Sequence, residues 1–144
     1  MKIIIGSDHA GFEYKKLLIK YFDANKISFE DCGTHNDDPT DYPDYAHVVS
    51  KKVSQSKNHI GVLVCGSANG VAMTANKHKN IRAAICWSEE IAAQSRTHNN
   101  ANIICIPARF ISKEKQKKII DVFLSKKFEG GRHANRVSKI NCEQ

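Results

Sequence analysis

The residues best suited to chemistry form the segment Cys65-Gly66-Ser67-Ala68-Asn69-Gly70, which follows an apolar run and opens a stretch with helical spacing. Backbone N–H groups at the start of a helix bind anions, and they also lower the pKa of a thiol placed there. Cys65 is therefore a candidate thiolate base or nucleophile. The alternative is a buried cysteine that only closes a strand.

Three familiar motifs do not fit this segment. A cysteine-dependent phosphatase requires arginine after five intervening residues, and Val71 occupies that position. A P-loop closes on Gly-Lys-Ser/Thr, whereas Gly70 is followed by Val71 and Ala72. The dinucleotide pattern G-x-G-x-x-G follows none of the apolar runs. Phosphatase, P-loop and dinucleotide-binding functions are therefore excluded.

Other polar groups stand at the ends of predicted elements. Asp8 and His9 follow the first apolar run, where Asp8 could instead cap a helix. His98 ends a helical stretch, where a histidine could simply favour the helix C-terminus. Arg132 and Arg136 are four residues apart, so a helical turn would make them either a phosphate clamp or a pair of surface salt-bridge formers.

Strands and helices alternate along the chain and must position these groups. Short β-branched runs at residues 3–5, 27–32, 60–65, 81–86 and 103–106 predict five strands, separated by stretches with helical spacing. This alternation predicts right-handed βαβ units and a parallel sheet covered by helices on both faces, a doubly wound α/β fold. Ligands bind such sheets at the carboxyl ends of the strands.

Composition limits the remaining possibilities. A chain of 144 residues with 41% hydrophobic content suits one domain, residues 1–144, and no apolar stretch is long enough for a membrane span or a signal peptide. Five cysteines without a C-x-x-C pair, Cys142 among them, indicate a reducing compartment, and we expect a cytoplasmic protein. The net charge of +7 comes largely from lysines around residues 113–127, which we interpret as a solvated helix face rather than a nucleic-acid site.

Six segments together closely resemble the ribose-5-phosphate isomerase B family, which also includes the galactose-6-phosphate isomerase subunits. The segments are Gly6-Ser7-Asp8-His9-Ala10-Gly11, Thr40-Asp41-Tyr42-Pro43, Cys65-Gly66-Ser67-x-x-Gly70, Ala75-Asn76-Lys77, Ser95-Arg96-x-His98-Asn99 and Glu129-Gly130-Gly131-Arg132-His133. The resemblance implies a Rossmann-like αβα sandwich with a five-stranded parallel sheet and no metal or organic cofactor. It also implies a homodimer or dimer of dimers whose site lies at the subunit interface.

The activity implied by this resemblance is interconversion of ribose 5-phosphate and ribulose 5-phosphate through an enediolate, in the non-oxidative branch of the pentose phosphate pathway. By the same analogy Cys65 is the base and Ser67 handles the sugar oxygens. His98 opens the sugar ring with help from Asp8. Asn99 and the backbone amides of residues 66–70 hold the enediolate.

The resemblance also assigns the phosphate and the lining of the site. The implied phosphate contacts are His9, Arg109, Arg132 and Arg136, and the other substrate-binding positions are Tyr42, Gly66, Asn69, Gly70, Asn99 and His133. The C-terminal tail, residues 129–144, would contribute to phosphate binding and to subunit contacts. Because His98 closes a helix after the fourth strand and Cys65 opens one after the third, we expect them to come from different subunits.

Two positions depart from the family pattern, and other functions stay open. The family usually has glycine where Ala68 stands, and Asn69 replaces the small aliphatic residue of many members. The added methyl group of Ala68 could narrow the anion loop. Isomerisation of allose 6-phosphate or galactose 6-phosphate needs only a longer pocket, and a non-catalytic sugar-phosphate sensor could share the fold. We expect neither nucleic acid nor a membrane as a partner.

Overall fold

The computed structural model describes residues 1–141, and Cys142 lies outside the described residues. Five strands form one sheet in the order β2-β1-β3-β5-β4, and every neighbouring pair is parallel. The strands are β1 (Lys2–Ser7), β2 (Phe29–Asp31), β3 (His59–Cys65), β4 (Ala83–Ile85) and β5 (Ile103–Pro107). The predicted five-stranded parallel sheet is thus confirmed. The edge strands β2 and β4 are shorter than predicted, because each pairs on one side only.

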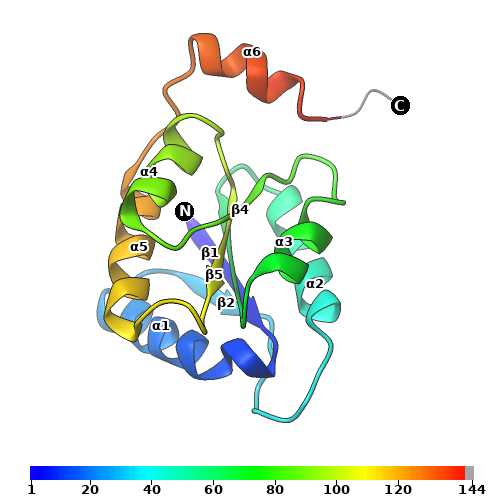
Figure 1. The fold of residues 1–144 in the computed structure, drawn as a ribbon, viewed down its shortest axis with the longest axis vertical. Helices are drawn as coiled ribbons and strands as arrows, with labels where there is room; N and C mark the ends of the chain where they lie inside the picture. The colour runs from blue at the N-terminus through cyan, green and yellow to red at the C-terminus, as the bar shows by residue number, and fades with distance from the viewer. Residues whose placement is uncertain (142–144) are drawn as a thin grey trace.

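Helices cover both faces of the sheet, which gives the predicted αβα sandwich (Figure 1). One face carries α1 (Phe12–Ala24), α4 (Glu89–Thr97) and α5 (Lys113–Ser125), and the other carries α2 (Tyr42–Ser54) and α3 (Asn69–Ala75). Side chains of a strand alternate between the faces, so Ile3 and Ile5 pack under the first group of helices and Ile4 under the second. The lysines around α5 are exposed.

The order of the strands fixes where a ligand can reach the sheet. From β1 the chain moves outward to β2 and then crosses back over the opposite face through α2 to β3. The direction of winding therefore switches between β1 and β3, and such a switch leaves a crevice at the carboxyl ends of the two strands. Asp8 follows β1 and Cys65 ends β3, so the fold brings both to this crevice.

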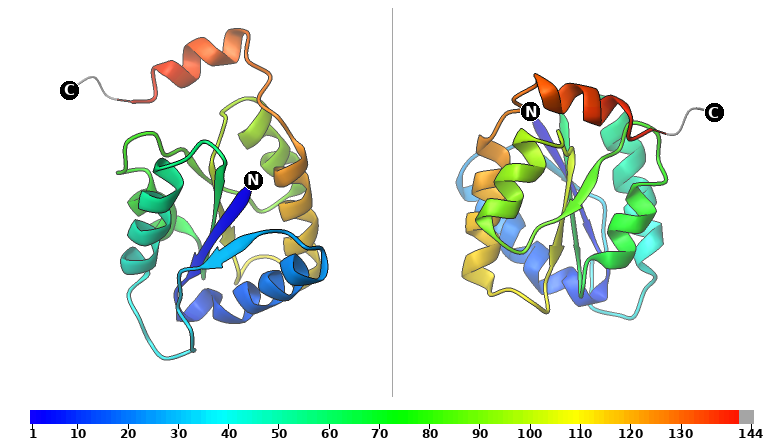
Figure 2. Two further views of the ribbon diagram at one scale, coloured as in Figure 1. Left: turned by 180° about the vertical axis from the view of Figure 1, so that it is seen from behind. Right: turned by 45° about the horizontal axis from the view of Figure 1, so that its top comes forward.

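A sixth helix, α6 (Arg132–Ser138), lies outside the sandwich at the opposite end of the sheet (Figures 1 and 2). The segment before α6 is tied to the end of α4 by a hydrogen bond from the Glu129 N–H to the Thr97 carbonyl oxygen, 3.0 Å. The helical turn that would place Arg132 and Arg136 on one face is therefore present. Within residues 1–141, no helix combines the length and apolarity needed to cross a membrane.

Candidate active site

Cys65 and Asp8 form a buried pair at the carboxyl ends of β3 and β1. The thiol of Cys65 donates to Asp8 Oδ2 at 2.9 Å, while Asp8 Oδ1 accepts from the Gly11 N–H at 3.0 Å. Asp8 therefore fills both roles that the sequence left open, the helix cap and the site residue. One carboxylate oxygen caps the short helix η1 (His9–Gly11), and the other accepts the hydrogen bond of the thiol. Gly11 permits this approach, since a Cβ there would lie 2.2 Å from the Val64 carbonyl oxygen.

The pKa of Cys65 moves in the direction opposite to the sequence prediction. Burial, followed by the hydrogen bond to Asp8 and the charge of Asp8, raises the pKa of the Cys65 thiol to about 11. The backbone N–H groups of Ala68 and Gly66 do lower it, as a helix start should, but they are outweighed. The predicted lowering of the Cys65 pKa is therefore wrong for the single chain, because the sulfur is buried and contacts an anion.

The loop after Cys65 forms one wall of the crevice. Ser67 and Asn69 are exposed, and Ser67 Oγ accepts from the Asn69 N–H at 3.3 Å. Ala68, the residue that replaces the usual glycine, is buried and has a left-handed backbone with φ of 64°. The ring of Tyr42, from the start of α2, lies over Gly70, where an added Cβ would come within 2.4 Å of the ring.

Arg109 borders the same loop, and His9 directly follows Asp8 in the chain. Arg109 follows β5, and its N–H donates to the Gly66 carbonyl oxygen at 3.0 Å. The guanidinium of Arg109 lies against Gly66, 3.2 Å from the position of a Cβ there. His9 is exposed and contacts the backbone of Thr40 through Nδ1. The structure thus gathers nine predicted positions at one end of the sheet: Asp8, His9, Tyr42, Cys65, Gly66, Ser67, Asn69, Gly70 and Arg109.

The remaining predicted residues form a second group at the opposite end of the sheet. His98 and Asn99 follow α4, whereas Arg132, His133 and Arg136 belong to α6. Within residues 1–141 neither arginine forms an ion pair, which removes the surface salt-bridge interpretation for the described part of the chain. Asn69 stays with the first group through its contact with Ser67.

The imidazole rings of His98 and His133 stack in parallel, with centroids 4.3 Å apart and planes 7° apart. Burial, followed by the neighbouring His98, lowers the pKa of His133, against the opposing charge of Glu129. Ligand atoms of His98, Glu129 and His133 lie within 4.8 Å of one another, so these three are the side chains that could hold a metal ion in residues 1–141. Stacked parallel rings direct their in-plane nitrogen lone pairs side by side and not towards one point. One ring would therefore have to turn before both histidines could bind the same ion.

A single chain does not bring the two groups together. Parallel strands of the sheet start near His98 and end near Cys65, and five-residue β5 alone spans about 13 Å. Figure 2 shows the same separation, with α6 at one end of the sheet and the start of α1 at the other. Asp8 therefore lies far from His98 of the same chain, so the expected help from Asp8 in ring opening requires a second copy of the chain.

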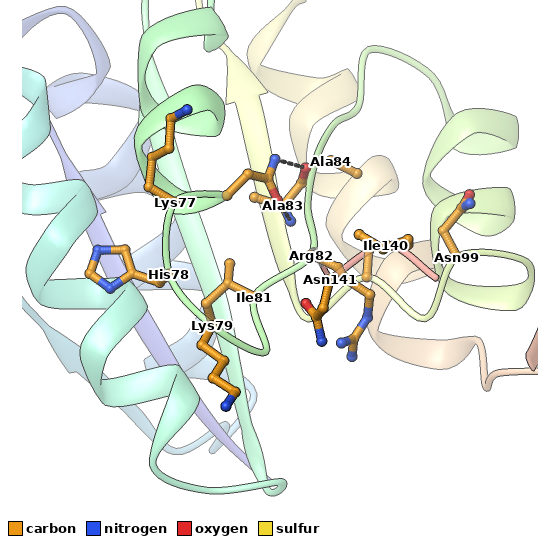
Figure 3. Close-up of a pocket in the computed structure, with 12 residues that line it drawn as sticks. Lys77, His78, Lys79, Ile81, Arg82, Ala83, Ala84, Asn99, Ile140 and Asn141 are labelled. Atoms are coloured by element: carbon orange, nitrogen blue, oxygen red, sulfur yellow. Dashed lines mark hydrogen bonds between the residues drawn. The ribbon is translucent and has the colours of Figure 1, made fainter. Parts of the chain in front are cut away.

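A cavity of about 950 Å³ adjoins the second group and contains none of the first. It lies between the α3–β4 connection, Asn99, and the residues after α6, Ile140 and Asn141. Lys77, His78 and Lys79 on its rim point away from one another (Figure 3). These three side chains therefore do not converge on one ligand position.

Sequence reasoning gave no individual role to three residues near the two groups. Thr40 and Tyr45 lie behind His9, and Glu129 lies beside His133. Tyr45 fits the apolar helical spacing of residues 45–53, which by itself predicts only a packing residue. The signal available in the sequence is the hydroxyl itself, because a tyrosine on a packed helix face usually finds a hydrogen-bond partner for its O–H.

Comparisons with known proteins identify the family of this chain. The ribose/galactose isomerase family model matches residues 3–140. A Mycoplasma pneumoniae protein named as a probable ribose-5-phosphate isomerase B is 45% identical over 96% of this chain and 91% of that protein. Ribose-5-phosphate isomerase B of Escherichia coli is 39% identical over 98% of this chain and 95% of its own length. The crystal structure of the Mycoplasma genitalium ribose-5-phosphate isomerase B with bound ribulose-5-phosphate superposes with a TM-score of 0.92 and 41% identity, covering 96% of this chain and 93% of that one.

Proposed function

Because the chain belongs to the ribose/galactose isomerase family, we propose that it interconverts ribose 5-phosphate and ribulose 5-phosphate, with Cys65 as the base. The observation that carries this proposal is the 2.9 Å hydrogen bond between Cys65 Sγ and Asp8 Oδ2 at the ligand-binding end of the sheet. A solved relative that is 41% identical holds ribulose-5-phosphate, which supports a phosphorylated pentose as the substrate.

The proposed proton transfers use the Cys65–Asp8 pair. The Sγ–H proton moves to Asp8 Oδ2, and the resulting thiolate takes the proton from C2 of the open-chain aldose. The same thiol then delivers that proton to C1 of the enediolate and recovers its own proton from Asp8. Ser67 moves a proton from O2 to O1. Each group is restored at the end of the cycle, as general acid–base catalysis requires.

Charge on the enediolate oxygens also needs stabilisation. The backbone N–H groups of residues 66–70 are fixed donors next to Cys65, and such preorganised donors typically contribute about 2.7–4 kcal/mol each. Binding of the phosphate far from the reacting carbons orients the sugar without affecting the proton transfers directly. His9 and Arg109 lie at the Cys65 end for that purpose.

We infer that a second copy of the chain completes the site. One copy would supply Cys65 and Asp8, and the other would supply His98 for ring opening with Arg132 and Arg136 for the phosphate. The separation of these groups within one chain supports this arrangement. It fits a homodimer or dimer of dimers with the site at the subunit interface.

A coupled assay tests the reaction itself. Purified protein should convert ribose 5-phosphate to ribulose 5-phosphate at the same rate with and without EDTA. Allose 6-phosphate and galactose 6-phosphate are run in parallel, and faster turnover of either would assign a six-carbon substrate. Loss of activity in EDTA, restored by a divalent ion, would contradict the metal-free mechanism. No turnover of any of the three sugars would favour the sensor alternative.

Mixed dimers test the shared site. Cys65→Ala and His98→Ala proteins, each inactive, are unfolded and refolded together in equal amounts. Random pairing makes half of the dimers mixed, and each mixed dimer has one intact site of two, so about a quarter of wild-type activity should return. Refolding each variant alone is the control. If mass measurements show mixed dimers but the mixture stays inactive, each chain carries its own complete site.

A further inference from the structure

His9 is held by the backbone of Thr40, in the irregular segment between β2 and α2. The Nδ1 atom of His9 lies 3.2 Å from the Thr40 nitrogen and 3.2 Å from the Thr40 carbonyl oxygen. A neutral imidazole can accept from the N–H, and a protonated imidazole can donate to the carbonyl. In both states Nε2–H stays available as a donor, and the exposed His9 can direct it towards an anion.

Thr40 is in turn held by Tyr45 from α2. The Tyr45 hydroxyl lies 2.9 Å from Thr40 Oγ1. The Tyr45 ring is wedged against Gly33, where an added Cβ would lie 2.8 Å from ring atom Cε1. The ring therefore has little freedom. Its hydroxyl is a fixed point from α2 that holds Thr40, which lies in a segment without regular structure.

We propose that Tyr45 is a positioning residue for the phosphate end of the site, because its hydroxyl fixes Thr40 and Thr40 fixes the imidazole of His9. This inference rests on the proposed function, in which His9 contacts the phosphate. Neither Tyr45 nor Thr40 needs to touch the sugar. Because the phosphate is remote from the carbons that exchange a proton, a displaced His9 weakens substrate and transition state equally.

Tyr45→Phe removes only the hydroxyl and tests this directly. Loss of one hydrogen bond typically changes an equilibrium by about two- to tenfold, so KM for ribose 5-phosphate should rise by about that factor, with kcat nearly unchanged. Tyr14→Phe is the matched control, since it removes another tyrosine hydroxyl bond, to the Ile111 carbonyl oxygen at 2.7 Å. The control should leave KM unchanged.

A double-mutant cycle separates positioning from a general loss of structure. In a His9→Ala background, Tyr45→Phe should add no further increase in KM, because the residue it positions is absent. Thr40→Val should reproduce the effect of Tyr45→Phe, whereas Thr40→Ser keeps the hydroxyl and should restore wild-type KM. If Tyr45→Phe raises KM equally with and without His9, or no more than Tyr14→Phe does, the proposal is wrong.

Nitrogen NMR of the histidine side chains distinguishes this proposal from the proposed function. Wild-type His9 should show the Nε2–H tautomer with Nδ1 as an acceptor, and Tyr45→Phe should give a mixture of tautomers. This result would support the positioning role even if the wild-type protein failed to isomerise ribose 5-phosphate. Identical His9 signals in both proteins would overturn it, whatever the activity.

Discussion

Replacing Asp8 with asparagine should make Cys65 more reactive and the enzyme slower. Asp8→Asn keeps the shape of the side chain but removes a negative charge whose oxygen lies 2.9 Å from Cys65 Sγ. The hydrogen bond and charge of Asp8 are the second and third causes of the raised Cys65 pKa, after burial. The substitution removes the charge and leaves the burial, so the pKa should fall only part of the way to that of an ordinary thiol.

The size of the effect follows from the pKa of about 11. A fall of roughly one unit is about 1.4 kcal/mol, and at pH 8 it raises the thiolate fraction from about one in a thousand to about one in a hundred. Because nucleophilicity declines as the pKa falls, reaction with an aromatic disulfide should accelerate only about threefold. Turnover should fall by roughly a hundredfold or more, because the carboxylate that accepts the thiol proton is gone.

The assay measures two rates between pH 7 and 9, the rate at which Cys65 reacts with the aromatic disulfide and the rate of isomerisation. Matched proteins carrying Cys65→Ala supply the background from the other cysteines. Wild-type turnover should vary little over this range, since its thiol proton stays within the Cys65–Asp8 pair. Turnover of Asp8→Asn should rise about tenfold per pH unit, because the thiol must now lose its proton to solvent. Unchanged or slower thiol reactivity would refute our view that Asp8 holds the thiol protonated.

Two further predictions concern the Cys65 loop. Cys65→Ala should abolish turnover. The affinity for ribose 5-phosphate, measured by calorimetry, should stay within about threefold of wild type, because the phosphate contacts lie elsewhere. A large loss of affinity would show that the thiol contributes to binding. Ala68→Gly should change the free energy of unfolding, measured by urea titration, by less than about 1 kcal/mol. Glycine relieves the strain of a left-handed alanine, about 1–2 kcal/mol, but it also removes a buried methyl group and makes the unfolded chain more flexible, and these effects offset each other. Ala68→Val should instead cost more than about 2 kcal/mol, and equal stability of the two variants would contradict the strain assigned to this position.

Much of the architecture could be predicted because strand and helix signals are local. Short β-branched runs alternating with helical spacing are enough to predict a parallel sheet, and the rule for its carboxyl ends predicts that Asp8 and Cys65 meet. The separation of His98 from Cys65 follows from the same topology, since a helix that connects parallel strands runs back to their starting end. The motifs in addition predicted the family, which the comparisons confirm.

The electrostatics of the site could not be predicted in the same way. The sequence places Cys65 before a helix, which lowers a thiol pKa, but burial raises that pKa, and so does the Asp8 carboxylate oxygen, 57 residues away in the chain. Spacing gives neither the identity of that oxygen nor its distance. Tyr45 was missed for a related reason, because a residue that acts through a hydrogen bond to a loop looks like a packing residue in an apolar pattern.

The placement of the predicted site residues at two ends of the sheet has a consequence for how Cys65 is activated. The pKa near 11 belongs to a chain in which the charge of Asp8 faces the thiol without a cation from α6. In the proposed assembly, Arg132 and Arg136 of a second copy would approach the Cys65 end together with the substrate phosphate. The positive charge of the arginines favours the ionised forms of both the thiol and the carboxylate, and the negative charge of the phosphate partly cancels this effect. Cys65 would therefore be kept protonated and unreactive in a lone chain and would lose its proton most readily where both copies and the sugar are in place.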